Sequence, residues 1–325
     1  MDLLQEIFNG KNITESSKKL YLANLKRLNN NEIPKNFNFL SNIEQIQEKI
    51  NKYKPNTQRS YIISIVSLLK LLKEKQPKKF KKLYDDYYEI LETLNNNLKD
   101  NTTKTEKEEQ NWISQDEIKQ KLNDKMIILE SIKDLKKINE SQYNDLLDLL
   151  ILSLFVLQKP RRNKDYQEMY VIRKYKDEYG TEKNFLDLFN NNFIFNNYKT
   201  KSTYQTQNQQ VNDNLRNIIN EYLKFHPLKK NFKQPNNTTT LFLVKYDGSA
   251  LSSNNALTRI LYKIFEKKIG SSMLRKLYLT DKYGEKMEQV NEIMNEMKND
   301  ANAMGNSVGT IQTNYIKKNT SESDP

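Results

Sequence analysis

A polar segment in the first half of the chain divides the sequence in two. Residues 95–110 read NNNLKDNTTKTEKEEQ, in which Leu98 is the only apolar residue. A stretch of this composition does not bury enough apolar surface to belong to a hydrophobic core. We therefore predict two domains, residues 1–100 and residues 112–325, joined by a linker at residues 101–111.

The first domain has the apolar periodicity of helices. Leucines recur every three or four residues after Thr14, a residue type that caps helices, and a second apolar stripe follows Pro55, with Thr57 as its expected cap. Lysines follow this second stripe. Two interpretations of them remain open: a solvated lysine face, which is the common case, and a surface that follows DNA phosphates. The candidate DNA-binding residues are Lys70, Lys73, Lys78 and Lys79.

The second domain begins with a capping box, because Ser114 is followed three residues later by Glu117. Helical patterns continue to residue 157. The pattern then changes at residues 185–211, where short apolar runs between Asn clusters predict a small sheet or hairpin. Helical periodicity returns in four stretches, at residues 215–225, 252–268, 272–278 and 287–297. The expected fold class is mainly α with a small β-sheet or hairpin.

The charge balance favours a polyanionic partner. Lys and Arg number 53 against 41 Asp and Glu, which gives a formal net charge of +12. Each phosphate that a cation neutralises releases a condensed counterion, so a basic protein gains affinity for nucleic acid. Lys, Asn, Ile and Tyr are also codon choices of an A/T-rich genome, and this second explanation of the charge remains open.

The residue types present exclude several classes of site. Cysteine is absent, which excludes disulfides and cysteine-bound zinc. His226 is the only histidine, so one chain cannot build a histidine-based catalytic triad or a two-histidine metal site. The apolar run at residues 146–157 is interrupted by Asp148 and Ser153 and is too short to span a bilayer. No signal-peptide pattern opens the sequence. We expect an intracellular protein with no membrane partner, in a nucleus or a viral replication compartment that the sequence does not choose between.

Four motifs in the second domain carry residues suited to phosphodiester cleavage. Such chemistry needs a nucleophile, cations that hold the charge of the transition state, and an acid for the leaving oxygen. In chain order the candidates are Arg161 and Arg162, Lys199 and Lys201, Ser272 and Arg275, and Asn306 with Tyr315. Each motif alone has an ordinary structural explanation. An arginine pair at a helix end more often caps the helix, and the chain has 19 tyrosines.

Taken in this order, the motifs resemble those of the tyrosine recombinase, or phage integrase, family. That family has an arginine with an acid three residues later, a lysine in a β-hairpin, His-x-x-Arg, a Gly-His or Gly-Trp pair, and the tyrosine nucleophile. Arg162 with Asp165 resembles the first motif. Lys199 resembles the hairpin lysine, with Lys201 as the competing choice. The resemblance covers residues 146–315 well and is weaker upstream.

The remaining motifs match with two departures. Ser272-Met273-Leu274-Arg275 resembles His-x-x-Arg with serine in place of histidine, and Gly305-Asn306 resembles the Gly-His pair with asparagine in its place. Asn306 precedes Tyr315 by nine residues, which is the usual spacing. Serine and asparagine are poor proton donors, but both can hydrogen-bond a phosphate oxygen. Ser272, Asn306, Lys201 and Arg161 are therefore predicted to position the phosphate.

The resemblance implies an enzyme that recombines or integrates DNA at specific sites without metal or other cofactor. Arg162 and Arg275 would hold the scissile phosphate, Tyr315 would attack it to give a 3′-phosphotyrosyl link, and Lys199 would protonate the 5′ leaving oxygen. The two domains would clamp double-stranded DNA, and a homotetramer would join two sites. The departures and the codon bias favour a virus or mobile element of a eukaryotic host. A type IB topoisomerase-like enzyme that relaxes DNA and an inactive DNA-binding descendant are the alternatives.

Overall fold

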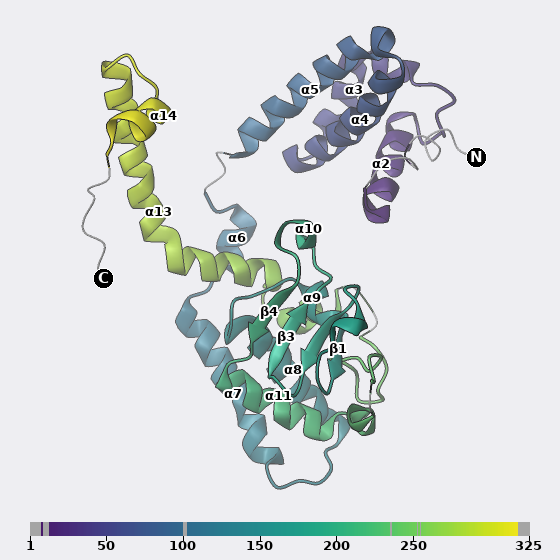
Figure 1. Ribbon diagram of the computed structural model, residues 1–325, viewed down its shortest axis with the longest axis vertical. Coiled ribbons are helices and arrows are strands. Elements are labelled where there is room, and N and C mark those ends of the chain that lie inside the picture. The colour runs from purple at the N-terminus through teal and green to yellow at the C-terminus, as the bar shows by residue number, and fades with distance from the viewer. Residues whose placement is uncertain are drawn as a thin grey trace. The chain divides into compact units, whose positions relative to one another are not determined.

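The chain folds into two compact units, Met1–Thr105 and Glu106–Pro325. The computed structural model describes Phe8 and residues 13–99, 103–234, 236–251, 253 and 255–317, and its ribbon is drawn in Figure 1. It is mainly helical with one small sheet, as the sequence predicts. Within these described residues, no helix is both long and apolar enough to cross a membrane.

Unit 1 consists of helices. They are α2 (Glu15–Leu28), the 3-10 helix η1 (Asn38–Ser41), α3 (Ile43–Asn51), α4 (Pro55–Lys75) and α5 (Pro77–Lys99). Thr14 accepts the Ser17 N–H at the start of α2, which confirms the predicted cap. The prediction of Thr57 as a cap is wrong, because α4 begins at Pro55. Proline suits the first helical position, where an N–H has no helical partner anyway.

The core of unit 1 lies between α2, α3, α4 and α5. Helix α4 is its central element, with Ile62, Ile65 and Leu68 fully buried. Tyr87 of α5 is buried against it and donates its hydroxyl to the Leu40 carbonyl. The helix α5 continues to Lys99, so it includes residues 95–99 of the polar segment. In this extension Asn95 accepts a hydrogen bond from Arg59 Nε of α4, a contact between the two helices that the composition of the segment does not show.

Unit 2 contains the sheet and the remaining helices. The helices are α6 (Glu106–Asn111), α7 (Gln115–Ile132), α8 (Glu140–Val156), α9 (Asn163–Gln167), α10 (Lys201–Tyr204), α11 (Asp213–Phe225), α12 (Ala256–Phe265), α13 (Ser271–Ala303) and α14 (Val308–Thr310), with 3-10 turns η2 (Asp177–Tyr179) and η3 (Lys229–Lys233) and the π turn η4 (Ile311–Tyr315). Ser114 and Glu117 form the predicted capping box of α7. Helix α6 lies within the predicted linker. Residues 100–102, which include the first two residues of that linker, lie outside the described residues.

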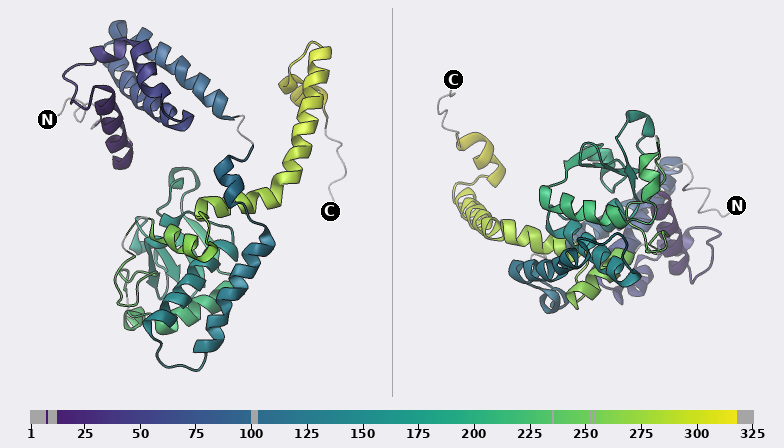
Figure 2. Two further views of the ribbon diagram at one scale, coloured as in Figure 1. Left: turned by 180° about the vertical axis from the view of Figure 1, so that it is seen from behind. Right: turned by 90° about the horizontal axis from the view of Figure 1, so that it is seen from below.

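The core of unit 2 surrounds α8, the most apolar helix of the chain. Helices α7, α11 and α12 pack against it, and the views in Figure 2 show these helices gathered at one side of the sheet. Most residues of α8 from Leu146 to Phe155 are buried. Tyr166 connects this helical layer to the sheet, because its ring contacts both Phe155 and Phe193.

The sheet has four short strands in the order β1-β2-β3-β4. They are β1 (Met169–Ile172), β2 (Asn184–Asp187), β3 (Asn192–Phe195) and β4 (Gln207–Gln210). Strands β2, β3 and β4 are antiparallel and lie where the sequence predicts a sheet. Strand β1 was not predicted. It pairs in parallel with β2, and a parallel partner requires a long connection that leaves no hairpin signal.

Helix α13 is a single helix where the sequence predicts two, at residues 272–278 and 287–297. Gly284 lies inside it, and one interior glycine costs about 1 kcal/mol relative to alanine, which is not enough to end a long helix. Figure 1 shows α13 as one continuous, bent ribbon. The helix ends at Ala303, and Gly305 follows its C-cap residue Met304 with a φ of +65°, which suits glycine. Asn306 donates its N–H to Ala301 and Gly305 donates to Asn302, which together close the helix end.

Candidate active site

Two arginines from distant parts of the sequence interact in unit 2. Arg162 is the N-cap residue of α9, and Arg275 lies in the second turn of α13. Burial lowers the pKa of Arg275 from its ordinary value, and the charge of Arg162 lowers it further, whereas Asp165 raises it. A guanidinium still keeps its charge at neutral pH. Because no ion pair within the described residues neutralises either one, the pair is suited to bind an anion such as a phosphate diester.

Arg161, the neighbour of Arg162, is held by other contacts. Its Nε lies 2.9 Å from Asp165 Oδ2, and its Nη1 donates to Gln207 of β4 at 2.9 Å. The guanidinium carbon also lies 3.7 Å from the centre of the Phe195 ring. Burial raises the pKa of Asp165 and the Arg161 charge opposes that rise. These contacts attach the turn at residues 160–162, which we call the arginine turn, to the sheet. They give Arg161 a structural role, whereas the role predicted for it was to position the phosphate.

The turn that carries Arg162 is also attached to the start of α13. Asn163 Nδ2 donates to Thr258 Oγ1 of α12 at 2.7 Å. Thr258 in turn packs against Gly270, the N-cap residue of α13, where an added Cβ would come within 3.2 Å of the Thr258 methyl group. This close approach explains how Arg162 and Arg275 come together. The sequence contains no signal for the role of Thr258, and only its adjacency to Arg162 points to Asn163.

Ser272 lies in the first turn of α13 and is exposed. The N-cap residue Gly270 provides no side-chain acceptor, so the first backbone N–H groups of the helix have no partner inside it. Helix N-termini attract anions for this reason. Ser272, which is predicted to position the phosphate, therefore lies beside backbone N–H donors, one turn before Arg275.

The two candidate lysines differ in their contacts. Lys199 is exposed in the connection between β3 and β4 and forms no hydrogen bond or ion pair within the described part of the chain. Its neighbour Tyr198 is buried, and the Arg161 guanidinium carbon lies 5.1 Å from the centre of the Tyr198 ring. We call residues 196–200, between β3 and α10, the Lys199 loop. The ring of Tyr198 therefore connects this loop to the arginine turn.

Lys201, in the same connection, is held by residues outside it. Its Nζ donates to the Thr181 carbonyl at 2.7 Å and to the Thr181 hydroxyl at 3.1 Å, and Glu182 lies 3.8 Å away. A lysine with these partners would have to give them up to reach a phosphate. The contacts favour Lys199 over Lys201 as the predicted catalytic lysine.

Tyr315 lies apart from the arginine pair. It is 63% exposed at the end of η4, where the Ile316 N–H bonds the Ile311 carbonyl. Gln312 Nε2 is 3.5 Å from Met294 Sδ, so this turn packs beside the second half of α13. A helix rises 1.5 Å per residue, so about 29 Å of helix axis separate Arg275 from Met294. Within one chain the structure does not bring Tyr315 to the arginines.

Asn306 belongs with Tyr315, not with the arginines. Its side chain donates to the Met304 carbonyl at 3.2 Å, immediately after the end of α13. The predicted site residues therefore fall into two groups in one chain. The first group consists of Arg162, Arg275 and Ser272. Arg161 contacts the Tyr198 ring, and this contact connects the Lys199 loop to the first group. Asn306 and Tyr315 form the second group, at the far end of α13.

The only histidine is not available for acid–base chemistry. His226 is 1% exposed, its Nδ1 accepts the Leu228 N–H, and its Nε2 lies 3.2 Å from the Leu241 carbonyl. Burial lowers its pKa to about 4. The ring is therefore a neutral structural element. Within the described residues, no group of three His, Cys, Asp or Glu side chains could hold a metal ion.

The candidate lysines of unit 1 lie around the junction of α4 and α5. Lys70 is exposed near the end of α4, and Lys73 places its Nζ 3.6 Å from the centre of the Tyr84 ring. Lys78 and Lys79 are exposed in the first turn of α5, which contains no acidic residue. A helix N-terminus is itself electropositive, so these two lysines strengthen a positive region.

No protein-family model matches the chain, and comparisons with curated proteins and with solved structures also found no match.

Proposed function

We propose that this protein cleaves and rejoins double-stranded DNA at specific sites through Tyr315, as a tyrosine recombinase does. The observation that carries the proposal is the pair of Arg162 and Arg275, whose charges meet without an ion-pair partner among the described residues. The Asp165 carboxylate attracts both guanidinium groups and is also paired with Arg161, so one negative charge faces three positive charges. This excess of positive charge favours a further anion beside the pair. A phosphate diester is an anion that two guanidinium groups can bind through its non-bridging oxygens.

The proposed reaction needs only residues of this chain and DNA. Arg162 and Arg275 hold the non-bridging oxygens of the scissile phosphate while the Tyr315 oxygen attacks phosphorus. The bond from phosphorus to the 5′ oxygen breaks, and Lys199 supplies the proton to that oxygen. The tyrosine is then joined to the 3′ phosphate. A 5′ hydroxyl of a second strand reverses the step and releases the tyrosine, so the energy of the diester bond is conserved.

The separation of the two groups of site residues supports an assembly of several chains. Because about 29 Å of helix axis lie between Arg275 and Met294, Tyr315 reaches an arginine pair most directly in a second copy of the chain. Each copy would then give its tyrosine to a neighbour. This exchange fits the homotetramer that we expect on DNA.

The surface of α13 after residue 278 suits contact with protein better than contact with DNA. Between residues 279 and 303 it has six acidic and three basic residues, in a chain of net charge +12. Five apolar side chains, spaced by three or four residues, are exposed along it: Leu279, Tyr283, Met287, Val290 and Ile293. An acidic helix with an exposed apolar stripe is complementary to a basic second copy of the same chain and is repelled by phosphates.

Trapping of the covalent intermediate tests the proposal. Nicked duplexes of randomised sequence let the short 5′-hydroxyl fragment diffuse away after cleavage, so protein stays attached to DNA on a denaturing gel. We expect adducts with the wild type and with Tyr204→Phe, a control tyrosine that is equally exposed at 62%, and none with Tyr315→Phe. Absence of adducts from all three, with DNA binding intact, would favour an inactive DNA-binding protein. Adducts together with relaxation of supercoiled plasmid by a monomer would favour a topoisomerase.

A further inference from the structure

We propose that a polar cleft between the start of α4 and the end of α5 reads base edges in the major groove of DNA. The inference rests on the proposed function in one respect, because it takes duplex DNA as the partner. It assigns the choice of DNA sequence to unit 1 and to residues other than the lysines considered above. We call this surface the α4–α5 cleft.

The α4–α5 cleft is a cavity of about 600 Å³ in unit 1. Its polar lining comes from Asn56 and Arg59 on α4 and from Tyr88, Glu92, Asn95 and Asn96 on α5. Arg59 Nε donates to Asn95 Oδ1, which ties the two helices together at this end. A guanidinium has five N–H donors, and within the described residues Arg59 makes no ion pair. Most of its donors therefore remain for a ligand.

The side chains of the cleft are those that distinguish bases from one another. Asparagine can both donate to and accept from adenine, arginine donates two bonds to guanine, and a carboxylate accepts from the cytosine amino group. Asn56 is exposed and forms no side-chain hydrogen bond within the described residues, and Glu92 is exposed on the facing helix. Lysine offers only a point charge, whereas the guanidinium of Arg59 offers a planar set of donors. The polar lining gives an apolar ligand little to bury against.

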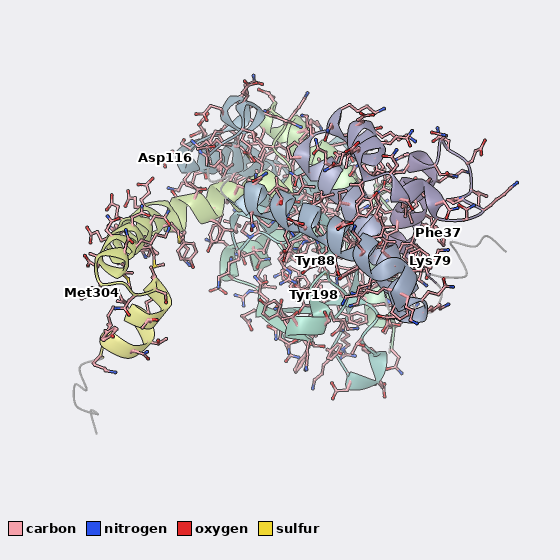
Figure 3. The ribbon with its side chains drawn as sticks, turned by 90° about the horizontal axis from the view of Figure 1, so that it is seen from above. Phe37, Lys79, Tyr88, Asp116, Tyr198 and Met304 are labelled. Atoms are coloured by element: carbon pink, nitrogen blue, oxygen red, sulfur yellow. The ribbon has the colours of Figure 1, made fainter. Side chains whose placement is uncertain are left out.

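The cleft is connected to Lys73 along the same pair of helices, because the Tyr84 ring beneath Lys73 stacks on Tyr88 of the cleft lining. Arg59 and Asn95 meet at one end, and Lys73 covers the Tyr84 ring at the other. The fourteen residues from Arg59 to Lys73 span about 21 Å of α4. Figure 3 labels Lys79 and Tyr88 along α5. A helix pair of this length can place its polar end in a major groove while the lysine end contacts phosphates, the usual division between base reading and positioning.

Selection of DNA by the full-length protein tests the inference. The wild type, Asn56→Ala, Arg59→Lys and the control Lys79→Ala are each used to enrich a pool of randomised duplexes, which is then sequenced. Arg59→Lys keeps the charge and removes the planar fork, so we expect its preference at one or two base positions to fall by about tenfold while affinity for unrelated DNA stays nearly constant. Lys79→Ala should weaken binding to all sequences equally and lower its salt dependence.

The outcomes separate this inference from the proposed function. Unchanged base preferences in Asn56→Ala and Arg59→Lys would overturn the inference alone, since adducts at Tyr315 could still form. A wild type that binds DNA without any preference would overturn the inference and also the site specificity of the proposed function. Absence of DNA binding by the wild type would overturn both. Urea unfolding of each variant identifies any loss that comes from the fold, and Asn56→Ala, at an exposed position, serves if Arg59→Lys is unstable.

Discussion

Arg162 lies close enough to Arg275 for its charge to lower the pKa of the Arg275 guanidinium. The two residues come from α9 and α13, which the contact between Thr258 and Gly270 helps to bring together. The Asp165 carboxylate attracts both groups and is also paired with Arg161. Three positive charges therefore share one negative charge, an excess that a bound phosphate would balance.

Removal of either arginine should cost activity and not stability. We expect Arg162→Ala and Arg275→Ala to slow adduct formation by about 10²–10³-fold, because each donor stabilises charge that develops in the transition state. Their melting temperatures should stay close to that of the wild type, because the relief of repulsion between the arginines and the loss of attraction to Asp165 oppose each other. Arg259→Ala, an exposed arginine of α12, is the control with unchanged activity. A melting temperature several degrees below wild type would mean that the pair is structural. Thermal unfolding and single-turnover adduct formation provide both readouts.

Two inactive variants should restore each other if the tyrosine comes from a second copy. Arg275→Ala keeps Tyr315, and Tyr315→Phe keeps the arginine pair. In a mixture, we expect adducts at least about tenfold above either variant alone, because each variant supplies the group whose loss costs about 10²-fold or more. The DNA should be attached to the Arg275→Ala chain, which a tag that changes its size identifies on the gel. Adducts missing from the mixture, with wild type active, would place the tyrosine and the arginines of one active site in the same chain.

Substrates with different leaving groups should distinguish the roles of Lys199 and Lys201. Lys199→Ala should slow cleavage of ordinary DNA by about 10²–10⁴-fold, the range for general acid catalysis. DNA with sulfur at the bridging 5′ position should be cleaved by this variant almost as fast as by the wild type, because a thiolate leaves without a proton. Lys201→Ala should lose only the contacts with Thr181 and Glu182 and cleave both substrates. The opposite pattern would make Lys201 the acid.

His226 should make unit 2 sensitive to mild acid. Its folded-state pKa of about 4 is below its usual value of 6.5. As pH falls below 6.5, the unfolded chain takes up a proton that the folded chain refuses until pH 4, so stability is lost over that window. The loss between pH 7 and pH 5 is about 2 kcal/mol. Urea unfolding of the wild type and His226→Gln at both pH values should show their difference in stability shrink by this amount. A constant difference would contradict the low pKa.

Local signals in the sequence predicted much of the fold. Thr14 and the pair of Ser114 and Glu117 cap helices through bonds to N–H groups three residues away, so a short window contains the whole interaction. The antiparallel strands were predicted for the same reason. Strand β1 depends on a parallel partner and on backbone bonds with residues far along the chain: the Val171 N–H donates to the Thr240 carbonyl, and the Phe242 N–H donates to the Met169 carbonyl. No short window of the sequence records these bonds.

The candidate site was predictable in its residues but not in its arrangement. Charge and motif order selected Arg162, Arg275 and Tyr315, whereas the continuity of α13 through Gly284 decides how far apart they lie. One glycine disfavours a helix by only about 1 kcal/mol, so the sequence does not show whether the helix continues through it. The contacts of Arg161 with Gln207 and Phe195 likewise depend on the folded sheet, so its sequence neighbourhood resembled that of a phosphate ligand.

Identification of the residue joined to DNA tests the central claim most directly. Adducts from the wild type are digested with protease and nuclease, and the peptide that keeps a nucleotide is sequenced by mass spectrometry. We expect the modified residue to be Tyr315, attached to a 3′ phosphate, and the other DNA end to carry a free 5′ hydroxyl. Attachment at a different tyrosine, or to a 5′ phosphate, would contradict this claim.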